Sequence, residues 1–276
     1  MAENDTIAKS ANGPVTVDSL VTDLTTLGVQ PGMTLIVHSS LSALGWVCGG
    51  PVAVIQALEA VLTPAGTLVM PTHSSDLSDP APWQHPPVPE SWWAIIRATM
   101  PAYDSDLTPT RGMGAIPETF RKQPGVCRSM HPQSSFAAWG AQADFVVNGQ
   151  TLENGMGKDS PLDRIYELDG SILLLGVGYD NNTSLHLAEY RADFPGKRHQ
   201  TQGAPIMENG QRRWVTFTDL DCDSVDFAAL GAAYVAAGNP CNSGPVGYSR
   251  ARLMPQRPLI DFAVQWLPAH RQQPEE

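Results

Sequence analysis

The sequence predicts an α/β fold, arranged as one large domain. The length of 276 residues suits a single large α/β domain, with or without an elaborated cap, better than two independent domains. The hydrophobic fraction of 42% is enough for a core, and the 24 glycines and 24 prolines indicate many turns and long loops. About the first seventy residues follow the order helix, strand, loop, helix, strand, in which the second helix can serve as a crossover.

Spacing and turn residues define the elements of this N-terminal part. Apolar residues at helical spacing over 17–27, followed by Gly28, predict a helix that ends at the glycine. The β-branched run 34–38 predicts a strand that ends at His38. A helix is expected over 52–62, with Pro51 in its first turn, and a strand over 66–70.

Similar patterns predict the elements of the rest of the chain. A domain over 15–268 is expected between a disordered lead-in at 1–14 and a frayed tail at 269–276. The stretch 77–107 is rich in proline, tryptophan and acidic residues, so it is either a lid or a structural insertion held by its tryptophans. The remaining expected elements are a helix starting at Pro117, a turn leading into a strand over 129–140, a helix at 160–168 capped by Ser160, a strand within 171–178, a helix at 183–191, a hairpin at 202–218, a helix at 224–237, a strand at 246–254 and a helix at 258–267.

A histidine and a glutamate three residues apart form the first candidate site. The apolar run 171–178 ends at glycine, as a buried strand does, and the helix expected at 183–191 follows it. On that helix His186 and Glu189 would share one face and point toward the carboxyl end of the strand, where ligands bind in open α/β sheets. A solvated ion pair on a surface helix is the more common result of such spacing.

The loop after His38 is the second candidate site. Small hydroxyl residues and the pair Gly49-Gly50 precede a helix, and such a loop can offer backbone N–H groups to an anion such as phosphate. Arg111, beside Gly112 and Gly114, could contact phosphate as well. The loop has neither the P-loop pattern nor the dinucleotide-binding fingerprint, so a simple turn remains the alternative.

Composition limits the classes of partner. The net charge of −11 disfavours nucleic acid and anionic membranes and is compatible with a cationic ligand. The four cysteines lie far apart without a CxxC pair, so reduced thiols and no metal site are expected. No stretch resembles a membrane span or a secretory signal, so a cytoplasmic protein is expected.

Three sequence blocks together resemble one known family. They are 37–45 (Val-His-Ser-Ser-Leu-Ser-Ala-Leu-Gly), 108–118 (Thr-Pro-Thr-Arg-Gly-Met-Gly-Ala-Ile-Pro-Glu) with 130–136 (Met-His-Pro-Gln-Ser-Ser-Phe), and 182–189 (Asn-Thr-Ser-Leu-His-Leu-Ala-Glu). With these blocks in this order, the chain from about 15 to 267 is similar to the aminoglycoside 3-N-acetyltransferases, the antibiotic N-acetyltransferase family, whose fold is distinct from that of the GNAT superfamily. The stretch 77–101 lies outside this likeness.

The resemblance implies a single three-layer α/β/α domain with a mixed central sheet. It implies that acetyl-CoA donates an acetyl group to the 3-amine of a 2-deoxystreptamine ring, which gives antibiotic resistance. The base carried over from the family is His186, oriented by Glu189 and by Asp180. The residues expected to bind CoA are His38, Ser39, Ser40, Leu41, Ser42, Arg111, Met113, Gly114 and Phe120. Those expected to bind the polycationic substrate are His73, Asp76, Glu118 and Glu208, with Glu153 as a further acid.

This chemistry agrees with the residue types. A protonated amine must lose a proton before it attacks a thioester, and a neutral imidazole is suited to accept that proton. Backbone N–H groups near 38–40 could support the oxyanion. The role of His131, which begins a His-Pro turn, stays open, as does the choice between monomer and homodimer.

Two other functions are compatible with the sequence, and a third is disfavoured. The same donor could serve a different amine in secondary metabolism, or the protein could bind CoA or a cation without chemistry. A zinc hydrolase is disfavoured because His186-Leu-Ala-Glu189 lacks the HExxH pair.

Overall fold

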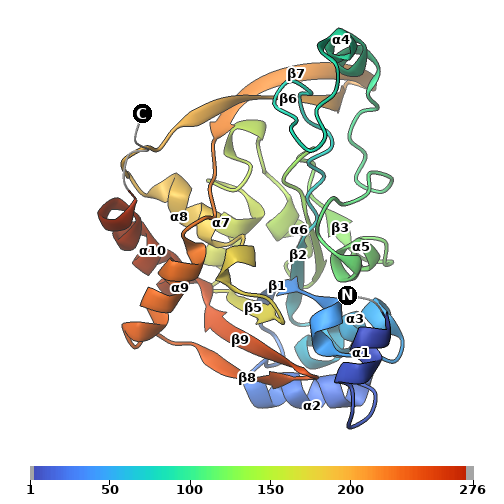
Figure 1. Cartoon of the computed structure of the whole chain (residues 1–276), viewed down its shortest axis with the longest axis vertical. Helices are drawn as coiled ribbons and strands as arrows, with labels where there is room; N and C mark the ends of the chain where they lie inside the picture. Colours follow the sequence, from blue (N-terminus) through green and yellow to red (C-terminus); the bar gives the residue numbers. More distant parts are fainter. Residues whose placement is uncertain (1–2, 272–276) are drawn as a thin grey trace.

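The central sheet has seven strands in the order β3–β4–β2–β1–β5–β9–β8 (Figure 1). The computed structural model describes residues 3–271 of the chain. Three strands in the middle of the sheet run parallel, namely β1 (Thr34–Ser39), β2 (Thr67–Pro71) and β5 (Ser171–Leu175). The outer strands are antiparallel to their neighbours: β3 (Cys127–Arg128), β4 (Phe136–Gly140), β8 (Asn242–Val246) and β9 (Ser249–Pro255). The expected mixed sheet is confirmed.

Helices pack on both faces of this sheet, because successive side chains of a strand point to opposite faces. Leu35 and Val37 of β1 join one hydrophobic core with α2 (Val17–Leu27), α3 (Gly50–Leu62) and α5 (Ala115–Phe120). Ile36, between them, belongs to a second core on the opposite face. The helices of this second core are α6 (Ala143–Val147), α7 (Pro161–Glu167), α8 (Leu185–Arg191), α9 (Phe227–Ala236) and α10 (Gln256–His270).

A long hairpin stands apart from the central sheet. Its strands β6 (His199–Glu208) and β7 (Gln211–Leu220) pair only with each other. The tip of the hairpin lies beside α4 (Glu90–Thr99) at the top of Figure 1. The Arg212 guanidinium of β7 donates a hydrogen bond of 2.7 Å to the Met100 carbonyl and another to the Arg97 carbonyl.

The helix α4 corrects the expectation for 77–107. That stretch contains ten helical residues, Glu90–Thr99, which follow Pro89 and have no buried side chain. Prolines around the helix conceal it in the sequence, although Pro89 itself is compatible with a helix start. Contacts with the hairpin and an Arg97–Asp79 ion pair of 2.8 Å hold the segment in place.

Both chain ends are more ordered than the sequence predicts. The lead-in contains α1 (Glu3–Lys9), which the Lys9 ammonium ties to the Ala43 carbonyl at 2.6 Å. The Ser10 hydroxyl accepts a hydrogen bond of 2.7 Å from the Trp46 N–H. At the other end, α10 continues to His270. Residues 1–2 and 272–276, which belong to the predicted lead-in and tail, lie outside the described residues.

Most predicted elements are present with shifted ends. Ser160 caps α7, as expected. The single strand expected at 246–254 is instead the end of β8, a turn at Gly247 and Tyr248, and most of β9. Three short 3₁₀ turns connect the elements that surround the site: η1 (Leu41–Leu44), η2 (Leu152–Asn154) and η3 (Tyr179–Asn181).

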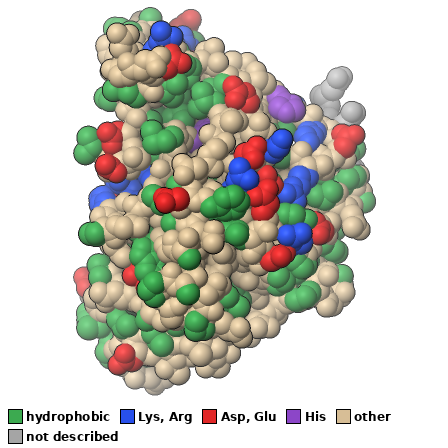
Figure 2. All heavy atoms as spheres, turned by 180° about the vertical axis from the view of Figure 1, so that it is seen from behind, with side chains coloured by type: hydrophobic (Ala, Val, Ile, Leu, Met, Phe, Trp, Pro, Cys, Tyr) green, Lys and Arg blue, Asp and Glu red, His purple; other side chains and the backbone are tan. Residues whose placement is uncertain are grey.

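Charged side chains of opposite sign lie next to one another on the face seen in Figure 2. Ion pairs near the surface of the described residues include those of Arg164 with Asp159 and Glu167, and of Arg257 with Asp169. Within residues 3–271, no helix has the length and apolar character needed to cross a membrane.

Candidate active site

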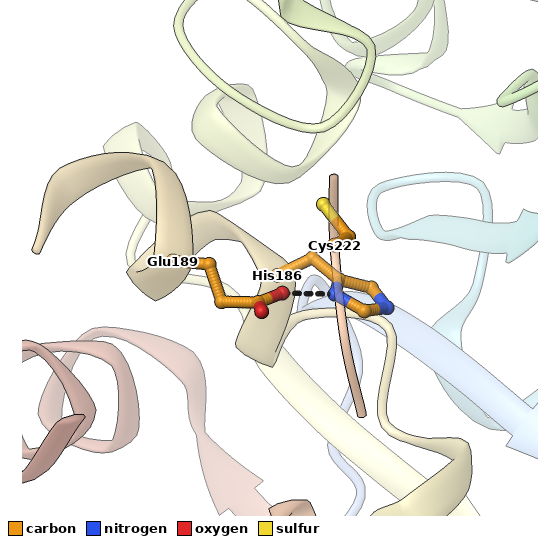
Figure 3. Close-up of side chains that lie close together, drawn as sticks. All are labelled: His186, Glu189 and Cys222. Carbon is orange, nitrogen blue, oxygen red and sulfur yellow. Dashed lines mark hydrogen bonds and ion pairs between the residues drawn. The ribbon is translucent and has the colours of Figure 1, made fainter. Parts of the chain in front are cut away.

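His186 and Glu189 form a direct pair on α8 (Figure 3). The His186 Nδ1 is hydrogen-bonded to the Glu189 Oε2, one helical turn away. The helix starts just after β5 and η3, where the Asn182 Oδ1 accepts a bond of 3.3 Å from the Ser184 N–H. The Glu189 side chain is 0% exposed and that of His186 is 15% exposed. The pair is therefore not the solvated surface ion pair that its spacing alone suggests.

Several donors hold the Glu189 carboxylate in its charged form. Burial alone would raise the pKa of Glu189, but hydrogen bonds from His186, the Asp223 N–H and Arg271 outweigh it and lower the pKa. The Asp223 N–H donates to Oε1 at 3.0 Å, and the Arg271 Nη1 donates to the same oxygen. A carboxylate at Nδ1 favours the tautomer whose proton is on that nitrogen.

The other ring nitrogen of His186 is available for chemistry. No hydrogen bond among the described residues involves its Nε2, which points away from Glu189 in Figure 3. The ring packs against Phe227 with a centroid distance of 4.9 Å. With the proton on Nδ1, Nε2 carries a free lone pair and can accept a proton from a substrate.

Two buried histidines lie near His186. Burial lowers the pKa of His38 to about 3, with a smaller contribution from the nearby His186. The pKa of His73 is also about 3, again through burial first and His186 next. Both rings are therefore neutral at ordinary pH, and the Nε2 atoms of both are buried without a hydrogen-bond partner. Such orphaned atoms at the carboxyl ends of β1 and β2 are suited to a substrate group.

An open cavity of about 740 Å³ adjoins the same end of the sheet. Ser39 lines it, next to His38, so the cavity and the His186 pair border the same strand end. Six of the nine residues expected to bind CoA line the cavity: Ser39, Ser40, Leu41, Ser42, Met113 and Gly114. Gly176, Val177 and Asn181, from the loop that leads to α8, complete one wall.

Three predicted CoA residues lie outside this lining. Phe120 is fully buried in the hydrophobic core, so its assignment to the cofactor site is corrected: it packs with the α3 side of the sheet. His38 is buried behind Ser39. The Arg111 N–H donates to the His73 carbonyl at 2.8 Å, while its exposed side chain pairs with Asp76 at 3.3 Å.

The backbone donors proposed for an oxyanion also need correction. The Ser40 N–H donates to the Leu175 carbonyl at 3.0 Å within the sheet, and so is already used. The N–H groups of Leu41 and Ser42 begin η1, and no hydrogen bond of the described residues uses them. Leu41 and Ser42 both line the cavity.

The predicted acidic residues do not converge on His186. Asp180, expected to orient the base, accepts a bond of 2.8 Å from Asn181 and has no hydrogen bond or ion pair to His186 within residues 3–271. Glu118 is bound by Arg121 and Lys122, at 2.8 and 2.7 Å. Burial would raise the pKa of Glu118, but these partners and Thr110 hold it well below its ordinary value.

The remaining acids are exposed or paired elsewhere. Glu208 lies at the hairpin tip and pairs with Arg213 at 2.8 Å, so the structure does not bring it to the site. Glu153 is an exposed residue of η2. His131, whose role the sequence left open, is structural: its Nδ1 accepts bonds from the N–H groups of Gln133 and Ser134, at 3.1 and 2.9 Å.

Cys222 lies beside the histidine–glutamate pair (Figure 3). Donor atoms of His186, Glu189 and Cys222 lie within 4.8 Å of one another, close enough to hold a metal ion. Both Glu189 oxygens are already engaged, one by His186 and the other by Arg271 and Asp223. Burial raises the pKa of the Cys222 thiol far above its ordinary value, with Glu189 and Asp219 adding to the shift. The three residues therefore fit a hydrogen-bonded pair beside a neutral thiol better than a metal site.

Arg271, Asp223 and Cys222 are site residues that sequence reasoning missed. They are 34 or more residues from His186 along the chain, so no local spacing links them to it. Asn181, in the wall of the cavity, precedes the third sequence block by one residue.

The site thus combines a histidine that has one nitrogen held by a buried carboxylate with an open cavity at the same end of the sheet, an arrangement compatible with an enzyme. A family model described as aminoglycoside 3-N-acetyltransferase matches residues 36–268. The chain belongs to this family.

Individual relatives match almost the whole chain. YokD of Bacillus subtilis (strain 168), an SPbeta prophage-derived aminoglycoside N(3')-acetyltransferase-like protein, is 48% identical over 94% of this chain and 95% of its own. Its crystal structure superposes with a TM-score of 0.94, at 44% identity, over 97% and 98% of the two chains. Aminoglycoside N(3)-acetyltransferase VII of Streptomyces paromomycinus is 37% identical over 95% and 94%.

Two similar solved structures contain ligands. The binary complex of AAC-IIIb with CoASH has a TM-score of 0.84 and 30% identity, over 96% of this chain and 100% of that one. AAC-VIa bound to sisomicin has a TM-score of 0.84 and 32% identity, over 94% and 99%.

Proposed function

We propose that this protein transfers an acetyl group from acetyl-CoA to the 3-amine of a 2-deoxystreptamine aminoglycoside, with His186 as the general base. The observation that carries the proposal is the His186–Glu189 pair, whose free Nε2 lies at the sheet end that borders the cavity. The likeness to AAC-IIIb, solved with CoASH, and to AAC-VIa, solved with sisomicin, supports the two substrates. The expected consequence in a cell is antibiotic resistance.

The donor fits the cavity between η1 and the Gly112–Ala115 segment. Unused N–H groups of Leu41 and Ser42 can donate hydrogen bonds to phosphate oxygens or to the thioester oxygen. The small residues that line the cavity allow an extended chain such as pantetheine to approach the backbone. Acetyl-CoA is a cytoplasmic metabolite, so we place the reaction in the cytoplasm.

The reaction then needs a single base. Nε2 of His186 takes a proton from the amine, whose nitrogen attacks the thioester carbonyl carbon. The tetrahedral intermediate expels the CoA sulfur as the C–S bond breaks, and the proton held by His186 passes to that thiolate. The second surplus proton of the attacking ammonium group leaves to solvent, so one proton is released for each acetyl group transferred. The Glu189 carboxylate stabilises the imidazolium in between. The acetyl group moves directly from donor to amine, with no acyl-enzyme intermediate.

Transfer to a different amine is the second candidate. It is favoured by the ion pairs that Asp76, Glu118 and Glu208 make with arginines, because paired carboxylates are less available to a polycation. In that case the donor and base stay the same and the acceptor changes.

A thiol-release assay separates these functions. Wild-type protein, acetyl-CoA and a panel of aminoglycosides should release CoA, and NMR of the product should place the acetyl group on N3. Release only with other amines would select the second candidate. Tight binding of CoA with no release from any amine would contradict both and leave a binding protein.

A further inference from the structure

Arg271 joins three separate parts of the chain at the back of the active-site pair. Its Nη1 donates to the Glu189 Oε1, on α8. Its Nε and Nη2 donate to the two carboxylate oxygens of Asp226, each at 2.8 Å, just before α9. Its Nη2 also donates to the Asp223 carbonyl at 2.5 Å. The residue follows directly on the last residue of α10, so the end of that helix is fixed to the site.

The guanidinium has a defined orientation. Its side chain is 12% exposed, and its central carbon lies 4.8 Å from the centre of the Phe194 ring. A planar fork that binds two carboxylates at once while resting on an aromatic ring is a geometry that lysine cannot reproduce. Arg271 is thus held as firmly as the pair that it contacts.

The contact with Glu189 has a consequence for His186. The buried carboxylate is shared between the imidazole on Oε2 and the guanidinium on Oε1. A carboxylate that already faces a permanent positive charge stabilises an imidazolium less than an unshared one does. Arg271 therefore takes up part of the charge of Glu189 and fixes the orientation of the carboxylate whose Oε2 meets the imidazole.

We propose that Arg271 is a positioning residue of this site, which fixes the Glu189 carboxylate and shares its charge so that His186 meets the amine in its neutral form. This inference rests on the proposed function, because a neutral His186 is needed only if the reaction begins with proton removal.

Other ionisable groups around the pair do not substitute for Arg271. His38, His73 and Cys222 are neutral, because burial lowers the pKa of both histidines to about 3 and raises that of the thiol. Lys197 is near enough to Glu189 for their charges to interact, but its ammonium donates to the carbonyls of Tyr190 and Ala192. The remaining acidic groups on this side are Asp193, Asp219, Asp223 and Asp226.

Two substitutions test the proposal by their effect on proton affinity. In Arg271→Gln, the histidine NMR titration of the free protein and the acidic limb of kcat, at saturating substrates, should both move up by about one pH unit. Well below the wild-type limb, kcat should then be about tenfold lower than that of the wild type. Comparison with His186→Gln identifies the His186 signal. Arg271→Lys keeps the charge, so its titration should stay near the wild type while its kcat falls, because the fork is lost.

The matched control is Arg257→Gln. Arg257 lies at the opposite end of α10 and pairs with Asp169, and both side chains are exposed. This variant should leave the titration and the limb unchanged. If Arg271→Gln lowers kcat equally at every pH with no shift of the titration, Arg271 is only structural and the proposal is wrong. If Arg271→Gln does not fold, Arg271→Lys decides the question. An upward shift of its histidine titration by about one pH unit would overturn the proposal. Failure of the proposed function is a separate result: the wild type would release no thiol, while the NMR titration would still report the pair.

Discussion

At the scale of single residues, the account depends on which atom of His186 carries its proton. Glu189 is buried and charged, and it bonds to Nδ1. This contact leaves Nε2 as the atom that can accept a proton from an amine. The contact is buried in a low-dielectric environment, where a hydrogen bond to a charged acceptor is stronger than one to a neutral acceptor.

Glu189→Gln tests this role with little change in shape. The neutral amide removes the charge that stabilises the imidazolium and permits the wrong tautomer, so kcat should fall roughly 10²- to 10⁴-fold. Thiol release at saturating substrates measures the effect, with circular dichroism to verify folding. Glu167→Gln, on the surface of α7 and paired with Arg164, is the control and should retain full activity. Near-normal turnover of Glu189→Gln would show that His186 needs no charged partner.

The sequence predicts the central pair but not the groups around it. A spacing of three on a helix is enough to place His186 and Glu189 on one face. Arg271 meets Glu189 only because α10 packs against α8 in the tertiary structure, and no spacing reports that. Asp180 is close to His186 in sequence, but its carboxylate is hydrogen-bonded to Asn181 in η3.

At the scale of elements, the segment between β2 and α5 brings glycines to the cavity. Gly112 and Gly114 have φ of 71° and 84°, values at which a side chain is strained. A Cβ on Gly114 would meet no protein atom within 4 Å, because the glycine faces the open cavity.

Gly114→Ala should therefore affect the donor more than the fold. The methyl group occupies space assigned to CoA, and the backbone strain costs about 1–2 kcal/mol. We expect a several-fold higher KM for acetyl-CoA with little change in the KM for the amine, both measured by thiol release. Gly238→Ala is the control: it also has a positive φ, of 78°, and open space around its Cβ, but it follows α9 away from the cavity. Equal rises in KM for both variants would mean that Gly114 does not border the donor.

Element prediction succeeded where periodicity was strong and failed where it was broken. The helices α2 and α3 and the strands β1, β2 and β5 follow directly from apolar spacing. The helix α4 was not predicted because the prolines around it are typical of loops. Contacts with the β6–β7 hairpin hold it, since it has no buried face. The strand β8 contains Pro245, which is tolerated there because β8 is at the edge of the sheet.

At the scale of the whole molecule, buried neutral histidines make stability depend on pH. Burial lowers the pKa of His38 and His73 to about 3 and that of His131 to about 4. Unfolded histidine titrates at about 6.5, so the unfolded chain binds more protons between that pH and the folded values. The contribution of these three histidines to the free energy of unfolding should therefore be constant above about pH 7. It should fall as the pH drops below about 6.5.

Urea unfolding at a series of pH values measures this effect. The wild type should lose stability between pH 7 and pH 5. A variant with His131→Asn should show a shallower loss, because one of the three sites is removed. The replacement also changes the hydrogen bonds of His131 to the N–H groups of Gln133 and Ser134 at every pH, so the slope and not the midpoint is compared. A slope that is the same in both proteins would contradict burial as the cause.

The global arrangement was predictable only in part. Alternating elements indicate an α/β domain, and the family resemblance added the three layers and the mixed sheet, which the two cores and the strand pairing confirm. The strand order, the separate β6–β7 hairpin and the docking of Arg271 depend on contacts between residues far apart in sequence. Periodicity within a segment carries no information about them.

The central claim is that His186 removes the proton from the amine during acetyl transfer. It is tested most directly by CoA thiol release from acetyl-CoA and an accepted aminoglycoside, with wild-type protein and His186→Ala side by side. We expect turnover in the wild type and near-complete loss in His186→Ala, with unchanged circular dichroism and unchanged binding of acetyl-CoA. Retained turnover in folded His186→Ala would contradict it.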